Sequence, residues 1–177
     1  MNRWLCRPWC IGIITLFLVG ADQLTKVLAV RFLKGQDPFV LWDGVFELRY
    51  LENRGAAFGI FQGQRTFFLV MGLLVFAAGV FLFLRMSKEA RFLPLRLVGI
   101  FVMAGAWGNM LDRLRLSYVV DFFYFKLIDF PVFNVADIYV SVAVAVFALL
   151  IFFFYTDEDL QKLFVKNPGE ERGAGDE

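Results

Sequence analysis

Carboxylate and carboxamide side chains recur in two copies of one short pattern, Asn109-Met110-Leu111-Asp112 and Asn134-Val135-Ala136-Asp137. Each copy lies at the end of an apolar run long enough to cross a membrane, and Asp121 lies between the copies. Ionisable side chains at membrane depth are costly and are usually retained because they have a function. The pattern therefore indicates a polar site at the edge of a membrane, in which carboxylates carry out the chemistry.

Two other carboxylates each have a cation close by in the sequence. Asp22 precedes Lys26 by four residues, and Asp112 is followed directly by Arg113. Residues three or four apart share one face of a helix, and a neighbouring cation is the usual way to keep a carboxylate at membrane depth. We therefore expect structural roles for Asp22, Lys26 and Asp112.

Asp121 and Asp137 have no cation within one helical turn in the sequence. If these carboxylates face each other they cannot both ionise easily, so one stays protonated and the pair offers a base beside an acid. Aspartic proteases activate water with such a pair. Asn109 shares a helix face with Asp112, and Asn134 would share one with Asp137 if its helix began early enough. Asn134 also has a simpler interpretation as a helix cap, which leaves Asp137 in the first turn, where the helix dipole favours a negative charge.

The composition identifies a membrane protein and excludes several kinds of chemistry. Of the 177 residues, 59% are hydrophobic and 18% aromatic, against about 45–50% apolar residues in an average soluble domain. The chain has no His, which excludes a Ser-His-Asp triad and most zinc sites. The net charge of +1 gives no electrostatic footprint for nucleic acid. Acid–base catalysis is therefore left mainly to carboxylates.

Four apolar runs, at about residues 10–32, 67–84, 95–111 and 136–155, predict four transmembrane helices in an antiparallel bundle. Arginines precede the first run, as in a secretory signal peptide, but no cleavage site of small residues follows it, so we expect this helix to be retained. Arg3 and Arg7 precede the first run, the short link between the second and third runs is rich in Arg and Lys, and Lys162 and Lys166 follow the fourth. The other segments also carry cations, so the bias is moderate: Lys34, Arg49, Arg54, Arg65, Arg113, Arg115 and Lys126. This bias predicts that both termini are cytoplasmic.

The segment at about residues 33–65 differs from the helices. Asp43-Gly44 suits a tight hairpin turn, and the residues on both sides of it have the composition of strands. We expect a small β-sheet on the periplasmic surface. Residues 1–155 are then one membrane domain, and residues 156–177 are a charged and flexible tail.

The polar residues also share one depth. In an antiparallel bundle they fall in the outer halves of the helices, while the inner halves are almost entirely apolar. The main alternative function, a small ion- or proton-coupled transporter, also explains buried Asp and Lys residues. A transport pathway would have to continue through the inner halves, which offer almost no polar side chains. A purely structural scaffold would not explain the clustering.

Five segments of the chain resemble, in order, those of the lipoprotein signal peptidase (signal peptidase II) family, which are aspartic peptidases of the bacterial inner membrane. The resemblance extends from Asp22 to Asp137, with departures at Ser117, where glycine is usual, and at Phe130, where tryptophan is common. The matching segments are Asp22-Gln23-Leu24-Thr25-Lys26, Asn53-Arg54-Gly55-Ala56-Ala57-Phe58-Gly59, Gly108-Asn109-Met110-Leu111-Asp112-Arg113, Val119-Val120-Asp121-Phe122 and Phe133-Asn134-Val135-Ala136-Asp137.

This resemblance implies an enzyme that removes signal peptides from prolipoproteins by cleaving on the N-terminal side of a cysteine that carries diacylglycerol. It implies that Asp121 and Asp137 are the catalytic residues. The residues implied to bind substrate or to support the catalytic pair are Asn53, Gly55, Asn109, Arg113 and Asn134. The implied partners are diacylglyceryl-modified prolipoproteins and membrane lipids, and no metal or organic cofactor is needed. We expect a monomer of the inner membrane with its active site toward the periplasm.

Overall fold

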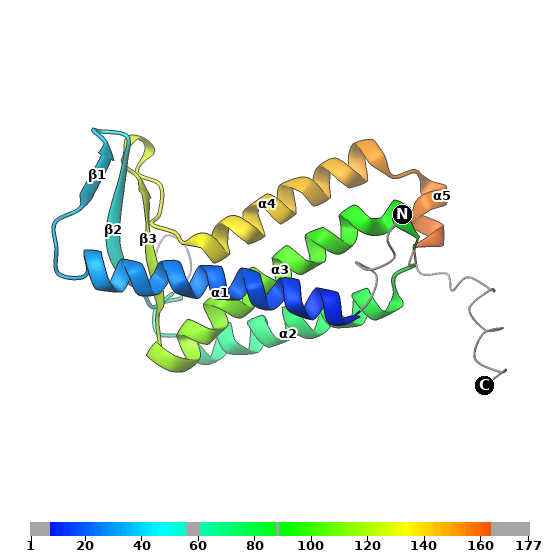
Figure 1. Cartoon of the computed structure of the whole chain (residues 1–177), viewed down its shortest axis with the longest axis horizontal. Coiled ribbons are helices and arrows are strands. Elements are labelled where there is room, and N and C mark those ends of the chain that lie inside the picture. Colours follow the sequence, from blue (N-terminus) through cyan, green and yellow to red (C-terminus); the bar gives the residue numbers. More distant parts are fainter. Residues whose placement is uncertain (1–7, 56–60, 88, 164–177) are drawn as a thin grey trace.

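Four long helices form the body of the protein in a computed structural model that describes residues 8–55, 61–87 and 89–163. They are α1 (Pro8–Leu33), α2 (Arg65–Arg85), α3 (Leu93–Leu116) and α4 (Val135–Leu149), and α4 continues as the π-helix η5 (Leu150–Phe154). A short 3-10 helix, η3 (Ala90–Phe92), leads into α3. Figure 1 shows the four helices running along the long axis of the molecule, which confirms the predicted bundle.

The outside of the bundle is apolar, as expected for a surface that faces lipid rather than water. Each of the four helices, with η3 and η5 included, is long and apolar enough to cross a membrane. None of the α2 residues is buried. Phe17, Phe152 and Phe153 are 74%, 78% and 84% exposed, respectively. Since a soluble protein rarely exposes apolar patches of this extent, the chain is a multi-pass membrane protein.

A three-stranded antiparallel sheet lies across one end of the bundle (Figure 1). Its order is β1 (Phe39–Trp42), β2 (Phe46–Asn53) and β3 (Val119–Phe125). The predicted hairpin is confirmed, and Gly44 in its turn has a φ of +68°, which glycine adopts without strain. The sequence did not predict β3. Pairing of β2 with β3 places Leu51 opposite Asp121, so the strand that supplies Asn53 runs beside the strand that supplies Asp121.

A tight turn joins α3 to β3. Ser117 ends the helix with a φ of +69°, and its backbone N–H donates to the carbonyl of Arg113 over 3.2 Å. Glycine is the residue best suited to this left-handed conformation at the end of a helix. The departure noted at Ser117 therefore falls on a position where glycine has a backbone role, and the turn forms in spite of it.

The opposite end of the bundle differs from the predicted flexible tail. Residues Asp157–Lys162 form a short helix, α5, capped by Thr156. Arg91 pairs with Asp159 over 2.8 Å, and the Tyr155 hydroxyl donates to the Arg91 carbonyl over 2.9 Å. The hydrogen bond from Arg91 holds the pKa of Asp159 at about 2. The first part of the tail is thus docked onto the link between α2 and α3, and residues 164–177 lie outside the described residues.

Two glycines of α3 allow α4 and α1 to approach closely. A Cβ added at Gly105 would lie 2.5 Å from the Ala136 carbonyl oxygen and 2.6 Å from Val140 Cγ2. A Cβ at Gly108 would lie 2.5 Å from Asp22 Oδ2. Small residues at such positions are a common way to bring membrane helices together. Gly105 and Gly108 therefore set the distance between the helices that carry the polar residues.

We predict that Gly105→Ala destabilises the protein, because the new methyl group collides with the α4 backbone. Overpacking of this kind costs roughly 1–3 kcal/mol, and thermal unfolding in detergent measures it. Gly99→Ala is the matched control, since a Cβ at Gly99 meets nothing within 4 Å. Equal melting temperatures for the two variants would contradict the close approach of α3 and α4.

Candidate active site

A buried lysine lies at the centre of the polar cluster. Lys26, on α1, is 3% exposed, and its Nζ lies 2.9 Å from Asp22 Oδ2 and 3.1 Å from Asp112 Oδ2. The pairing of Asp22 with Lys26 was predicted. The predicted pairing of Asp112 with Arg113 was wrong, because Asp112 faces α1 across the helix interface and bonds to Lys26 and to Gln23 Nε2, the latter over 2.9 Å.

Asp22 and Asp112 also bind backbone groups of other elements. The Ala136 backbone N–H, at the start of α4, donates to Asp22 Oδ1 over 2.9 Å. The Val120 backbone N–H, in β3, donates to Asp112 Oδ2 over 3.1 Å. The N–H groups of the first helical turn have no partner within their helix, so Asp22 satisfies one such group of α4. The two carboxylates thus connect α1 and α3 to α4 and β3.

Asn109 connects this charged cluster to the predicted catalytic pair. Its Oδ1 accepts hydrogen bonds from Lys26 Nζ over 2.9 Å and from Asn134 Nδ2 over 3.1 Å. Its Nδ2 donates to Asp137 Oδ1 over 2.8 Å. Lys26 and Asp137, which are 111 positions apart in the chain, therefore bind opposite ends of one carboxamide.

Asn134 fulfils both interpretations that the sequence allowed. It caps α4 in a reciprocal capping box: its Oδ1 accepts from the Asp137 N–H, and Asp137 Oδ2 accepts from the Asn134 N–H, both over 3.1 Å. Its Nδ2 also donates to Asp121 Oδ1 over 2.6 Å. The side chain is fully buried. One residue therefore starts the helix and contacts both predicted catalytic carboxyls.

Asp121 is held in β3, 1% exposed, between two carboxamides. Asn53 Nδ2 donates to its Oδ2 over 2.8 Å, and Asn134 Nδ2 donates to its Oδ1. Burial raises its pKa to about 7, with a further contribution from the charge of Asp137, against the hydrogen bonds from Asn53 and Asn134. A carboxyl group with such a pKa holds a proton close to neutral pH and is suited to acid–base chemistry there.

The start of the loop after β2, as far as Gly55, is fastened beside Asp121. Asn53 Oδ1 accepts from the Gly55 backbone N–H over 2.9 Å, and Arg113 Nη2 donates to the Gly55 carbonyl over 3.0 Å. The Arg113 guanidinium also lies 4.4 Å from the ring centroid of Phe68, on α2. Arg113 thus joins α3, α2 and this loop. Ala56, Ala57, Phe58 and Gly59, the rest of the matched loop, lie outside the described residues.

The structure brings together all ten residues that the sequence analysis singled out. Their contacts form one hydrogen-bonded network that joins α1, α3, α4, β3 and the end of β2. Sequence reasoning missed Gln23, which donates to Asp22, to Asp112 and to the Gly108 carbonyl. Its position directly after Asp22, within a polar interruption of an apolar run, was the signal that could have pointed to it.

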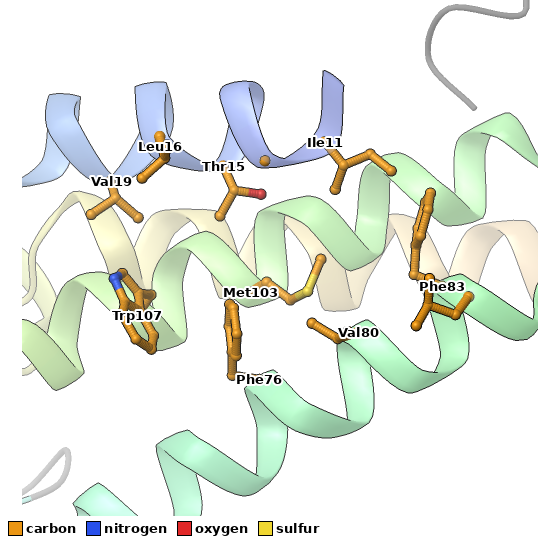
Figure 2. Close-up of a pocket in the computed structure, with 11 residues that line it drawn as sticks. Ile11, Thr15, Leu16, Val19, Phe76, Val80, Phe83, Met103 and Trp107 are labelled. Carbon is orange, nitrogen blue, oxygen red and sulfur yellow. The ribbon is translucent and has the colours of Figure 1, made fainter. Parts of the chain in front are cut away.

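An apolar cavity of about 350 Å³ lies between α1, α2 and α3, further toward the other end of the bundle. Figure 2 shows side chains from all three helices around it, among them Val19, Phe76, Met103 and Trp107. Trp107 lies two residues before Asn109 in the same helix. The cavity therefore begins about one helical turn from the polar network and has the chemistry to take a hydrocarbon chain.

The fold and the site together define a class of protein: a multi-pass membrane protein that carries two adjacent carboxyls in a polar network at one end of a four-helix bundle. The family model described as "Signal peptidase (SPase) II" matches residues 14–153. The chain belongs to the signal peptidase II family and is therefore a membrane peptidase.

Individual relatives agree with this assignment. The chain is similar to the lipoprotein signal peptidase of Streptococcus thermophilus (strain CNRZ 1066), with 38% identity over 82% of this chain and 94% of the relative. It is 41% identical to the lipoprotein signal peptidase of Gloeothece citriformis, over 91% of this chain and 95% of the relative. A solved bacterial membrane enzyme superposes with a TM-score of 0.73 at 28% identity, over 81% of this chain and 88% of that one.

Proposed function

We propose that this protein is an aspartic endopeptidase that removes signal peptides from prolipoproteins, cleaving on the N-terminal side of a diacylglyceryl-modified cysteine. The observation that carries the proposal is the placement of Asp121 and Asp137 around Asn134, each bound by carboxamide N–H groups. The lipoprotein signal peptidases that the chain resembles supply the substrate class. The catalytic residues and the aspartic type of chemistry are inferred from the geometry.

In this mechanism the two carboxyls share one proton. Asp121, whose pKa is raised to about 7, donates its proton to the oxygen of the scissile carbonyl. Asp137 accepts a proton from the attacking water, and its carboxylate is stabilised by N–H donors and by the start of α4. The C–N bond then breaks as Asp137 returns its proton to the leaving nitrogen and Asp121 takes back a hydroxyl proton from the tetrahedral intermediate. The carboxamides of Asn53, Asn109 and Asn134 hold both carboxyls in position throughout.

The remaining parts of the structure suit a lipid-modified substrate. The apolar cavity between α1, α2 and α3 has room for hydrocarbon and begins close to Asn109, so we assign it to an acyl chain of the substrate. The sheet lies across the end of the bundle that carries the network (Figure 1), and Arg113 holds Gly55 beside it, so we assign contact with the peptide to this end. All of the described site residues come from one chain, in keeping with a monomer.

We place the protein in the bacterial inner membrane with both termini cytoplasmic and the site toward the periplasm. The short link between α2 and α3, at the end of the bundle opposite the sheet, contains Arg91 and is flanked by Arg85 and Arg96. This local density of cations supports the orientation, because short cytoplasmic loops are rich in Lys and Arg. A transporter is not supported: the relatives are peptidases. The helix halves away from the site also lack a continuous polar path, since Thr15 is the one buried polar side chain of α1 between residues 9 and 21.

The test of this function is cleavage of a diacylated prolipoprotein by purified protein in lipid, followed by mass analysis of the fragments. We expect the wild type to release the signal peptide, and Asp121→Asn and Asp137→Asn to lose nearly all cleavage, because each removes half of the acid–base pair. Thermal unfolding checks that both variants are folded. A folded variant with near-normal turnover would refute the assignment of that residue.

The pH dependence of turnover should report the proton on Asp121. Because the pKa of this group is raised to about 7, its proton is present below that pH and is lost above it, so kcat falls as the pH rises through about 7. Asn53→Ala removes a hydrogen bond that favours the ionised form, which raises the pKa further. The alkaline limb of the profile should then move to higher pH, with a lower kcat.

Gln36→Ala is the control for this pH series, since it removes an exposed carboxamide outside the network. Its pH profile should match that of the wild type. An alkaline limb that stays in place or moves to lower pH in Asn53→Ala would mean that Asp121 is not the group that donates the proton.

The orientation predicts which loops face outward. After replacement of Cys6 and Cys10, a cysteine in place of the exposed residue Asp43 should react with an impermeant thiol reagent on cells with a permeabilised outer membrane. A cysteine in place of Glu89, exposed at the other end of the bundle, should react only after lysis. The reverse pattern would put the site on the cytoplasmic side.

A further inference from the structure

The ammonium group of Lys26 has all three of its N–H bonds in use. Its Nζ donates to Asp22 Oδ2, Asp112 Oδ2 and Asn109 Oδ1 at 2.9, 3.1 and 2.9 Å. A lysine that only neutralised the two carboxylates would not need the third contact. That contact leads toward the predicted catalytic pair, whereas the two carboxylates connect to the backbones of α4 and β3.

This third contact favours one of the two orientations of the Asn109 carboxamide. An ammonium group donates hydrogen bonds and accepts none, so the Asn109 atom beside it must be the carbonyl oxygen. The NH₂ end of the same side chain is then directed at Asp137 Oδ1, which it reaches over 2.8 Å. Rotation of the carboxamide by half a turn would direct its oxygen at the carboxylate and repel it. With no cation at position 26, the hydrogen bond from Asn134 Nδ2 to Asn109 Oδ1 would oppose that rotation alone.

Asn134 connects the Asn109 oxygen to the second carboxyl, that of Asp121. Asn109 Oδ1 also accepts from Asn134 Nδ2 over 3.1 Å, and the other hydrogen of that NH₂ group is directed at Asp121 Oδ1. The Asn134 orientation is fixed independently, because its Oδ1 accepts from the Asp137 backbone N–H. The NH₂ group of Asn109 is therefore directed at Asp137, and that of Asn134 at Asp121. The oxygen of Asn109 is directed at Lys26.

We propose that Lys26 is a positioning residue for catalysis, which orients the carboxamide of Asn109 so that it donates to Asp137. The inference rests on the proposed function, in which Asp137 is one of the two catalytic carboxyls. It gives Lys26 a part beyond that of a structural ion-pair partner, without contact with the substrate.

The charge of Lys26 has to be separated from its orienting effect. Among the described residues, the charged groups in and around the network include Asp22 and Lys26 on α1, Asp112, Arg113 and Arg115 on α3, Asp121 on β3 and Asp137 on α4. Lys26→Met removes both the donor and one positive charge. Loss of a nearby cation raises the pKa of Asp121. The double change Asp22→Asn with Lys26→Met removes one charge of each sign, so the electrostatic effect largely cancels while the donor to Asn109 is still missing.

The experiment compares kcat, KM and the pH profile of wild type, Lys26→Met and the double variant on a diacylated prolipoprotein in lipid, with thermal unfolding of each. For Lys26→Met we expect kcat to fall by up to about 100-fold, the loss that a misplaced catalytic group produces, with little change in KM and an alkaline limb at higher pH. For the double variant we expect the alkaline limb of the pH profile to return toward its wild-type position, while kcat stays low.

Recovery of wild-type kcat in the folded double variant would overturn the inference, because a purely structural or purely electrostatic lysine would be compensated. The double variant decides the question even if Lys26→Met alone does not fold. Lys34→Met, which removes a half-exposed lysine paired with Glu52, is the control and should leave kcat and the limb unchanged. A wild type that cleaves nothing would refute the proposed function instead.

Discussion

The rest of the site depends on a single ammonium group that is buried together with two carboxylates at the end of a membrane bundle. Burial of an unpaired charge in such a place costs several kcal/mol, so Lys26, Asp22 and Asp112 are stable there only together. Their partners come from α1 and α3. Asp22 Oδ1 accepts from the first turn of α4, and Asp112 Oδ2, which also contacts Lys26, accepts from the backbone of β3. The electrostatic requirement therefore fixes where four separate elements meet. Gly105 and Gly108 permit it, because a side chain at either position would push the helices apart.

The carboxamides of Asn53, Asn109 and Asn134 hold the carboxyls of Asp121 and Asp137 in different surroundings. Asp121 is enclosed by β3 and receives two side-chain donors, whereas Asp137 lies in the first turn of α4 and receives one side-chain and one backbone donor. A carboxyl in a buried strand keeps its proton more readily than one in solvent. Asn134 contacts both groups, so it also keeps them at a constant separation. Two chemically identical side chains are thereby given the environments of an acid and of a base.

The sequence contained most of this site because its signals were local. The spacing of Asp22 and Lys26 follows the helical repeat, and the Asn134–Asp137 pattern is that of a helix cap. The partner of Asp112 was not predictable in this way: its neighbour in sequence, Arg113, points to the loop after β2, and the contact with Lys26 exists only once α1 and α3 are packed. The strand β3 was missed because its seven residues give no alternation of polar and apolar side chains. The turn at Ser117 depends on a backbone angle that the residue type does not favour.

The order in which the polar residues occur along the chain has a consequence for biosynthesis. Lys26 lies in the first helix, Asn53 in the second strand, Asn109 in the third long helix, and the capping residue Asn134 comes after all of these. Until α4 has been inserted, Asp137 has neither its cap nor its position beside Asp121. A nascent chain with three helices in the membrane therefore lacks the adjacent pair of carboxyls to which we assign the reaction. Formation of the proposed catalytic pair waits for the last transmembrane helix, so the order of the residues along the chain couples the assembly of the site to completion of the fold.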